Sequence, residues 1–151
     1  MNNNLISCIA GVGAALAIGL LTHLEASTAE VVLVMAPFGA TAVLVFGVPN
    51  SPLAQPKNVV FGHLITAVIG VAFTQFVGVT PLTLAIASGL GVSVMLLTKT
   101  THPPAGANPM LIMLSGQSWA FLITPVLTGA VLIVLVGKAF NLLQRRLTKI
   151  T

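Results

Sequence analysis

The stretch Lys99–Leu114 reads KTTHPPAGANPMLIML and interrupts an otherwise apolar chain with prolines, a histidine and an asparagine. Proline cannot donate a backbone hydrogen bond, and it disfavours helix in the residue before it. We therefore expect the chain to enter Pro103–Pro104 in an extended conformation. Proline is well tolerated at the first position of a helix, because its missing N–H would be unpaired there anyway. The stretch predicts a break followed by a half-helix whose first turn is Ala105-Gly106-Ala107.

Composition places this break inside a membrane. Of the 151 residues, 56% are hydrophobic and 5% are charged, and the mean hydropathy is +1.07. Soluble domains carry roughly a quarter charged residues, because a water-facing surface needs them. We therefore expect an all-α integral membrane protein whose main partner is the lipid bilayer. The net charge of +4 comes from basic residues that flank apolar spans, which indicates membrane topology rather than nucleic-acid binding.

The apolar pattern divides the chain into six segments of a single membrane domain, residues 1–151. The segments are 5–24, 31–47, 59–79, 82–98, 105–114 and 119–143. Pro37 breaks the second segment and Pro103–Pro104 precede the fifth, so we expect about four full transmembrane helices and two broken or half-helix segments. The fifth would cover only about half of the bilayer core at about 1.5 Å per residue. The His-Pro-Pro stretch is therefore expected at membrane depth as non-helical backbone.

The basic residues predict one orientation. If all six segments cross and the N-terminus is cytoplasmic, the loops with Lys57 and Lys99 and the basic C-terminal tail all lie inside. Glu25 and Glu30 then lie outside. Both termini are expected in the cytoplasm. The first apolar segment follows MNNN without a small-residue cleavage site, so we expect it to be retained as a span.

The two broken segments resemble each other. PFGATAVLVFG, residues 37–47, and PAGANPMLIML, residues 104–114, both read Pro-x-Gly-Ala followed by a small polar residue, Thr41 or Asn108. We interpret residues 5–79 and 82–143 as diverged repeats. Three crossings in each repeat would make the second copy inverted, which is a common transporter architecture.

The breaks predict a site for a small anion. The first turn of a helix presents unpaired N–H groups and the positive end of the helix dipole. Two such ends that converge near the membrane midplane would form a pocket with free donors, although a Pro/Gly segment can also be a simple kink. The candidate donors are the backbone amides of Gly39, Ala40, Gly106 and Ala107 and the side chains of Thr41 and Asn108.

Histidines supply the titratable groups near the breaks. His102 lies in the break itself, where it could bind an anion when protonated, carry a coupled proton, or cap local carbonyls. His63, in FGHLITA, lies about one turn inside the third span and is a second candidate for the pathway, because polar groups at membrane depth are often functional. His23 is expected at the outer interface without a special role.

What the sequence lacks excludes several functions. The chain has no aspartate, its two glutamates lie outside the apolar spans, and Cys8 is the one cysteine. We therefore expect no cation site and no thiolate metal site. There is no acidic pair, zinc-ligand cluster or Ser-His-acid set, so we expect neither an enzyme nor a cofactor.

Two motif blocks resemble the HPP family of small integral membrane proteins, which is named for its His-Pro-Pro motif. One block is SPLAQPKNVVFGH, residues 51–63, and the other is HPPAGA, residues 102–107. The resemblance covers roughly residue 36 to the end. It implies four transmembrane helices and a probable transporter, and it links the chain to nitrite through plant chloroplast and cyanobacterial members. The motif positions are His102, Pro103, Pro104, Gly106, Ala107, Gln55, Pro56, Asn58 and His63.

The leading hypothesis is therefore transport of a small anion, with nitrite as the preferred candidate. We expect a homo-oligomer whose subunits contact each other through the glycine-rich faces of the first and fourth segments. Because no transit peptide precedes the first span, we expect a bacterial or cyanobacterial plasma membrane. One alternative is a neutral-solute or water channel, which Asn-Pro-Met at 108–110 faintly suggests. Another is a non-transporting scaffold subunit. The sequence does not decide whether the anion is nitrite, nitrate, formate or bicarbonate, or whether the protein is a channel or a proton-coupled carrier. It also leaves open the direction of transport and the number of subunits.

Overall fold

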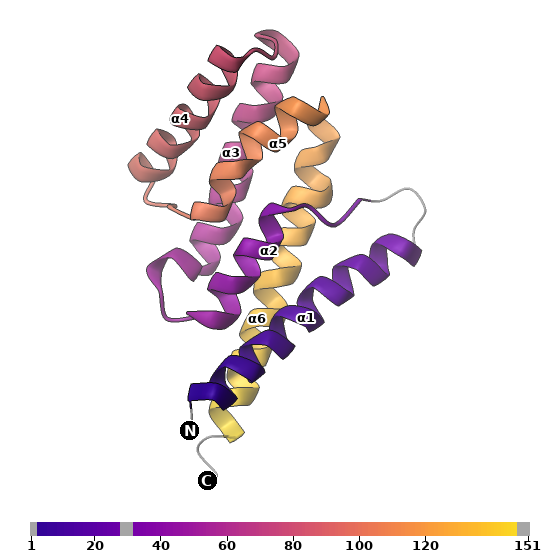
Figure 1. Cartoon of the computed structure of the whole chain (residues 1–151), viewed down its shortest axis with the longest axis vertical. Coiled ribbons are helices and arrows are strands. Elements are labelled where there is room, and N and C mark those ends of the chain that lie inside the picture. The colour runs from indigo at the N-terminus through magenta and orange to yellow at the C-terminus, as the bar shows by residue number, and fades with distance from the viewer. Residues whose placement is uncertain (1–2, 28–31, 148–151) are drawn as a thin grey trace.

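Helices make up most of the structure. The computed structural model describes residues 3–27 and 32–147 (Figure 1). The structure is 84% helical, and these described residues contain no strand. The expectation of an all-α membrane protein is confirmed.

The long helices come from three parts of the chain. Within the described residues, three helices are long and apolar enough to cross a bilayer, Asn4–Ser27, Pro56–Phe76 and Trp119–Gln144. They correspond to α1 (Asn3–Ser27), to α3 (Pro56–Phe76), and to the run formed by η4 (Trp119–Leu122), η5 (Ile123–Leu127) and α6 (Thr128–Leu147). Thr124 is non-helical within this last run, with φ −130° and ψ 121°. Helix α4 (Pro81–Leu97) is shorter and spans about 25 Å at about 1.5 Å per residue.

Both broken segments begin at proline, as the sequence predicts. Helix α2 (Pro37–Ala42) follows Ala36, which already has helical dihedrals, φ −50° and ψ −40°, and continues into a π-helical turn, η1 (Val43–Gly47). The second break leads into a 3₁₀ turn, η3 (Pro103–Ala107), and then into α5 (Asn108–Ser115).

The second half-helix differs in detail from the expectation. We expected an α-helical first turn at residues 105–107, but η3 is a 3₁₀ turn that starts at Pro103. The reason is Pro109, which has no N–H to donate to the carbonyl of Ala105. The amide of Asn108 bonds to that carbonyl instead, which gives the tighter spacing of a 3₁₀ turn.

A left-handed residue ends α4 and starts the break. Lys99 has φ 54°, and the amide of Thr100 donates to the carbonyl of Met95 at 2.9 Å. This arrangement commonly ends helices, although glycine usually occupies the left-handed position. His102 follows in an extended conformation, with φ −138° and ψ 98°. Asn58, in the first turn of α3, donates from Nδ2 to the carbonyl of Thr101 at 2.9 Å and so attaches the break to α3.

Helix α3 lies at the centre of the packing. It contacts α4, α5, η3 and α6, whereas α1 packs on the outside against α6 and η1 (Figure 1). The start of α1 and the end of α6 lie at the same end of the molecule. Gly62 lets the break approach α3 closely. A Cβ atom there would lie 2.9 Å from both Cβ of His102 and the carbonyl oxygen of Thr100. This close approach brings the second break onto α3.

Replacing Lys99 by glycine tests the left-handed helix end. We expect Lys99→Gly to raise the free energy of unfolding by about 1 kcal/mol, because glycine adopts a positive φ without the Cβ clash. Thermal unfolding in detergent measures the change. Lys57→Gly is the matched control, because it removes an exposed lysine from the helical first turn of α3 and should give no gain. Equal shifts for both variants would contradict this account of Lys99.

Candidate functional site

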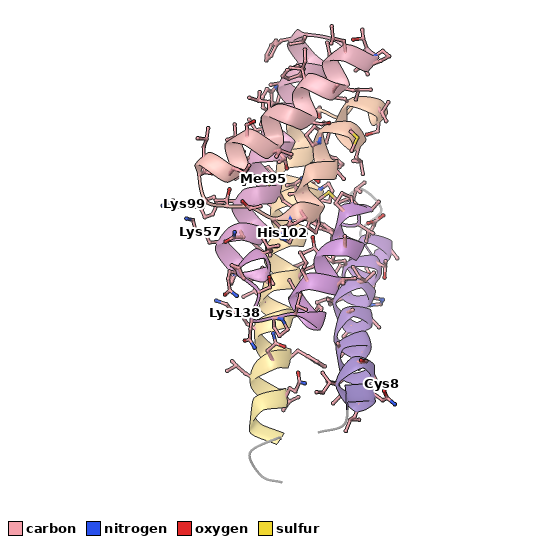
Figure 2. All side chains as sticks on the ribbon, turned by 60° about the vertical axis from the view of Figure 1, so that its left-hand side comes forward. Cys8, Lys57, Met95, Lys99, His102 and Lys138 are labelled. Atoms are coloured by element: carbon pink, nitrogen blue, oxygen red, sulfur yellow. The ribbon has the colours of Figure 1, made fainter. Side chains whose placement is uncertain are left out.

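Most of the buried polar side chains gather where the two breaks meet α3. Among the described residues, the buried polar side chains are Thr41, His63, Thr66, Thr100, His102 and Asn108. All except Thr100 belong to one hydrogen-bonded group, which we call the imidazole cluster: Thr41, His63, Thr66, His102 and Asn108. Each of these five side chains is fully buried. Figure 2 shows His102 within the helix bundle, whereas Lys57, Lys99 and Lys138 project at one edge.

The breaks position three of these side chains. Thr41 lies one turn after Pro37, and its hydroxyl contacts the carbonyl of Pro37 at 3.1 Å. His102 occupies the extended residue just before η3, and Asn108 is the first residue of α5. His63 and Thr66 lie one turn apart on α3, between the two broken segments. The cluster therefore joins segments that are distant in sequence.

One hydroxyl connects the two imidazoles. Oγ1 of Thr41 lies 2.8 Å from Nε2 of His63 and 2.9 Å from Nε2 of His102. The two rings meet edge to face, with centroids 5.0 Å apart. The ring of Phe38 packs against His63 in the same manner at 5.3 Å, so an apolar wall covers this part of the cluster.

The other ring nitrogens fix the direction of these hydrogen bonds. Nδ1 of His102 lies 2.8 Å from the carbonyl oxygen of Leu53, which can only accept, so Nδ1 carries the proton. In the neutral ring Nε2 is then bare, and it shares the single proton of the Thr41 hydroxyl with the carbonyl of Pro37, which lies 3.1 Å from Oγ1. Nδ1 of His63 lies 3.1 Å from Nδ2 of Asn108, which can only donate, so Nδ1 of His63 is bare. Nε2 of His63 therefore donates to Thr41.

The orientation of the Asn108 amide is also determined. The two N–H groups of Nδ2 are shared among three acceptors: Nδ1 of His63 at 3.1 Å, the carbonyl of His63 at 3.0 Å and Oγ1 of Thr66 at 3.0 Å. Thr66 itself donates to the carbonyl of Gly62 at 2.8 Å. Rotating the amide would place its oxygen against the His63 carbonyl. Oδ1 of Asn108 is left buried without a hydrogen-bond partner. Unpaired buried polar atoms are rare and require an explanation.

A directed chain of hydrogen bonds results. It runs from Asn108 to His63, from His63 to Thr41, from Thr41 to His102, and from His102 to the carbonyl of Leu53. Leu53 belongs to the turn η2 (Pro52–Ala54), which contacts α3 and η1. The next residue, Ala54, lines an open hollow of about 110 Å³ together with Gln55, Lys138 and Asn141. The chain therefore starts at a buried amide and ends at a turn whose next residue, Ala54, borders the hollow.

The residues proposed from the sequence fall into two groups. The structure brings the side chains of Thr41, His63, His102 and Asn108 together. Gly39 and Ala40 are exposed, whereas Gly106 and Ala107 are half-buried. The amide of Gly39 donates to the carbonyl of Ala36 at 3.1 Å, and Gly106 and Ala107 lie within the 3₁₀ turn. The buried polar groups at the meeting point of the two breaks are thus side chains rather than the predicted backbone amides.

Sequence reasoning missed Thr66, Phe38 and the carbonyl of Leu53. Thr66 follows His63 at the i+3 position, so it shares a helix face, and this spacing could have identified it. Phe38 lies between Pro37 and Gly39 in the first break. Leu53 lies in the motif block at residues 51–63 but contributes only its backbone, which no side-chain pattern reveals.

Comparisons with known proteins agree with this picture of a membrane protein. The family model for the HPP transmembrane region matches residues 2–148. Two curated proteins of Dictyostelium discoideum, each named only as a transmembrane protein, are 34% identical over 139 residues, which is 87% of this chain. The chain spans about half the length of these relatives, 49% of one and 45% of the other. No solved structure matches the chain.

Nitrogen NMR tests the direction of the hydrogen-bond chain. Protein labelled with ¹⁵N-histidine should show two neutral imidazoles with opposite tautomers, because His102 donates from Nδ1 and His63 from Nε2. His23→Gln removes the third histidine signal without touching the cluster. Identical tautomers for the two remaining rings would contradict the assignment.

Removing the shared hydroxyl tests the stability that it provides. Thr41→Val keeps the shape of the side chain but leaves the Nε2–H of His63 without an acceptor, at a cost of about 1–3 kcal/mol. Thr74→Val is the matched control, because the Thr74 hydroxyl on α3 has only a local bond to the carbonyl of Gly70, at 2.8 Å. Thermal unfolding in detergent compares them, and an equal loss in both variants would show that the bridge adds no stability.

Proposed function

The chain belongs to the HPP transmembrane family, and from that premise we propose that it carries a small inorganic anion, nitrite first, across the membrane. Family membership and the apolar helices are consistent with a transporter-like function. We propose, beyond this, that the transported solute is an anion and that this anion is nitrite. The observation that carries it is the imidazole cluster, in which two buried rings from different segments share one hydroxyl.

Charge supports an anion over a cation. Polar groups at membrane depth commonly mark solute pathways. The helices and turns that meet at the cluster carry no carboxylate. The carboxylate of Glu25 lies elsewhere, where Oε2 accepts from the amides of Leu33 and Val34, each at 2.9 Å. An imidazole can offer a donor, and a positive charge when protonated, to an anion.

The proposed binding residues are the side chains of Thr41, His63, His102 and Asn108, with the amides of Gly39, Ala40, Gly106 and Ala107 retained as secondary donors. Contact between α2 and η3 supports the retention, because the two proline-initiated turns meet beside the cluster. Pro37, Pro103 and Pro104 are proposed as structural breaks. The proposal involves no catalysis, cofactor or metal, and these absences stay predictions from the sequence.

The burial of the cluster supports a gated carrier over an open channel. Thr41, His63, His102 and Asn108 are all fully buried, so a solute reaches them only if the packing opens. A water or neutral-solute channel remains the alternative function, and a scaffold subunit the second alternative.

We also propose two inverted repeats and four full crossings. Each half has a proline-initiated broken segment followed by a longer helical run, and α4 would be the fourth full crossing. Placing both termini in the cytoplasm is supported by the common end at which α1 starts and α6 ends (Figure 1). A bacterial or cyanobacterial plasma membrane remains a prediction, and the curated relatives reported above come from Dictyostelium.

A homo-oligomer remains part of the proposal. The glycines Gly11 and Gly19 on α1 and Gly89 on α4 have open space beside them. Only 17% of the most apolar window of α1 is buried. A second copy or lipid could cover these faces.

Nitrite uptake into proteoliposomes tests the proposed function. The wild-type chain should accumulate nitrite faster than protein-free vesicles, and His102→Gln should lower the protein-dependent rate about tenfold if His102 lies in the pathway. His23→Gln, an exposed histidine on α1, is the matched control and should transport normally. Unchanged flux in His102→Gln would remove the site assignment. Water flux without anion flux would favour the water channel. The absence of both fluxes would favour the scaffold subunit.

A further inference from the structure

We propose that the imidazole cluster is a proton relay, in which the Thr41 hydroxyl passes a proton from His63 to His102. The proposal rests on the proposed transport function, because it assigns proton conduction to the same site. Its basis is the hydrogen-bond chain from Asn108 to the carbonyl of Leu53, in which each group lies 2.8–3.1 Å from the next.

The proton transfers balance along this chain. A proton binds to the bare Nδ1 of His63 as the Asn108 amide turns away. The ring then releases its Nε2 proton to Oγ1 of Thr41, and the Thr41 hydroxyl gives its own proton to Nε2 of His102. His102 releases its Nδ1 proton to a water molecule at the η2 turn, because the carbonyl of Leu53 accepts a hydrogen bond but is too weak a base to take the proton. One proton has entered and one has left, and both rings end neutral in the opposite tautomers.

The two ends of the relay differ in a way that suits this role. At the buried end, Oδ1 of Asn108 lacks a partner and can accept a hydrogen bond from an arriving proton donor. When the Asn108 amide turns away from Nδ1 of His63, its bonds to the His63 carbonyl and Thr66 also rearrange, because all three acceptors face the same nitrogen. At the other end, Ala54 follows Leu53 and lines the open hollow of about 110 Å³, where water could take the proton.

No other ionisable side chain competes for the proton inside the bundle. The elements α2, η1, η2, η3, α4, α5, η4 and η5 contain no acidic or basic residue. Within its residues, α3 adds only Lys57, which is exposed in its first turn. Lys138 of α6 is exposed at the hollow, and Lys99 is exposed just before the break. Among the described residues, Glu25 of α1 is partly buried but bonds to the amides of Leu33 and Val34. At the cluster itself, the two imidazoles are the titratable groups.

Proton flux measured separately from nitrite flux tests the relay. Proteoliposomes that contain the full chain and an internal pH dye are given a potassium diffusion potential with valinomycin, without nitrite. The wild type should conduct protons above protein-free vesicles. Thr41→Val should lower the protein-dependent rate about tenfold, because it breaks the chain between the rings, and Thr41→Ser should restore it. Thr74→Val is the matched control and should conduct normally.

Several outcomes decide between the relay and the transport proposal. Nitrite uptake without any accompanying proton movement would overturn the relay and leave transport standing. Proton conduction without nitrite uptake would support the relay and overturn the nitrite proposal. Normal proton flux in Thr41→Val would overturn the relay. If Thr41→Val does not fold, the solvent isotope effect on the wild type and on Thr41→Ser tests the relay instead. A relay predicts slower proton flux in D₂O than in H₂O for both proteins. Equal flux in the two solvents would overturn the relay.

Discussion

The hydroxyl of Thr41 holds the two broken segments against α3. It accepts from one imidazole and donates to another, and those imidazoles belong to different parts of the chain. Inside a bilayer no water replaces a lost hydrogen bond, so each buried donor requires an acceptor from the protein. A hydroxyl is the smallest side-chain group that can do both. The positions of α2, α3 and η3 are therefore set relative to one another at this point.

Proline explains why the polar residues occur where they do. Thr41 and Asn108 each lie four residues after a proline, Pro37 and Pro104, in the matching parts of the proposed repeats. Both contact the ring of His63, Thr41 at Nε2 and Asn108 at Nδ1. The two breaks thus hold one imidazole from opposite sides. A proline-initiated turn places such a side chain one helical turn inside the segment, where it faces the packed interior.

The sequence was sufficient to predict the membrane class, the two breaks and four of the five side chains of the cluster, all except Thr66. Composition predicts the membrane class. The prolines and the matching Pro-x-Gly-Ala pattern predict the breaks and the polar residues beside them. The 3₁₀ form of η3 was not predicted, because it depends on which amide bonds to Ala105 once Pro109 cannot. The Leu53 carbonyl was also missed, because it reaches His102 only after the loop folds back on the break. Backbone partners brought together by tertiary packing leave no side-chain pattern in the sequence.

The shared hydroxyl also bears on the order of events in the proposed transport. The cluster is buried, so a solute can enter only if α2 separates from α3 or from η3. Either movement takes Thr41 away from His63 or from His102 and interrupts the hydrogen-bond chain. A solute in the opened site and a proton passing through the closed chain would then exclude each other in time. Such alternation distinguishes a coupled carrier from a pore, and here it would follow from one side chain that must touch both rings.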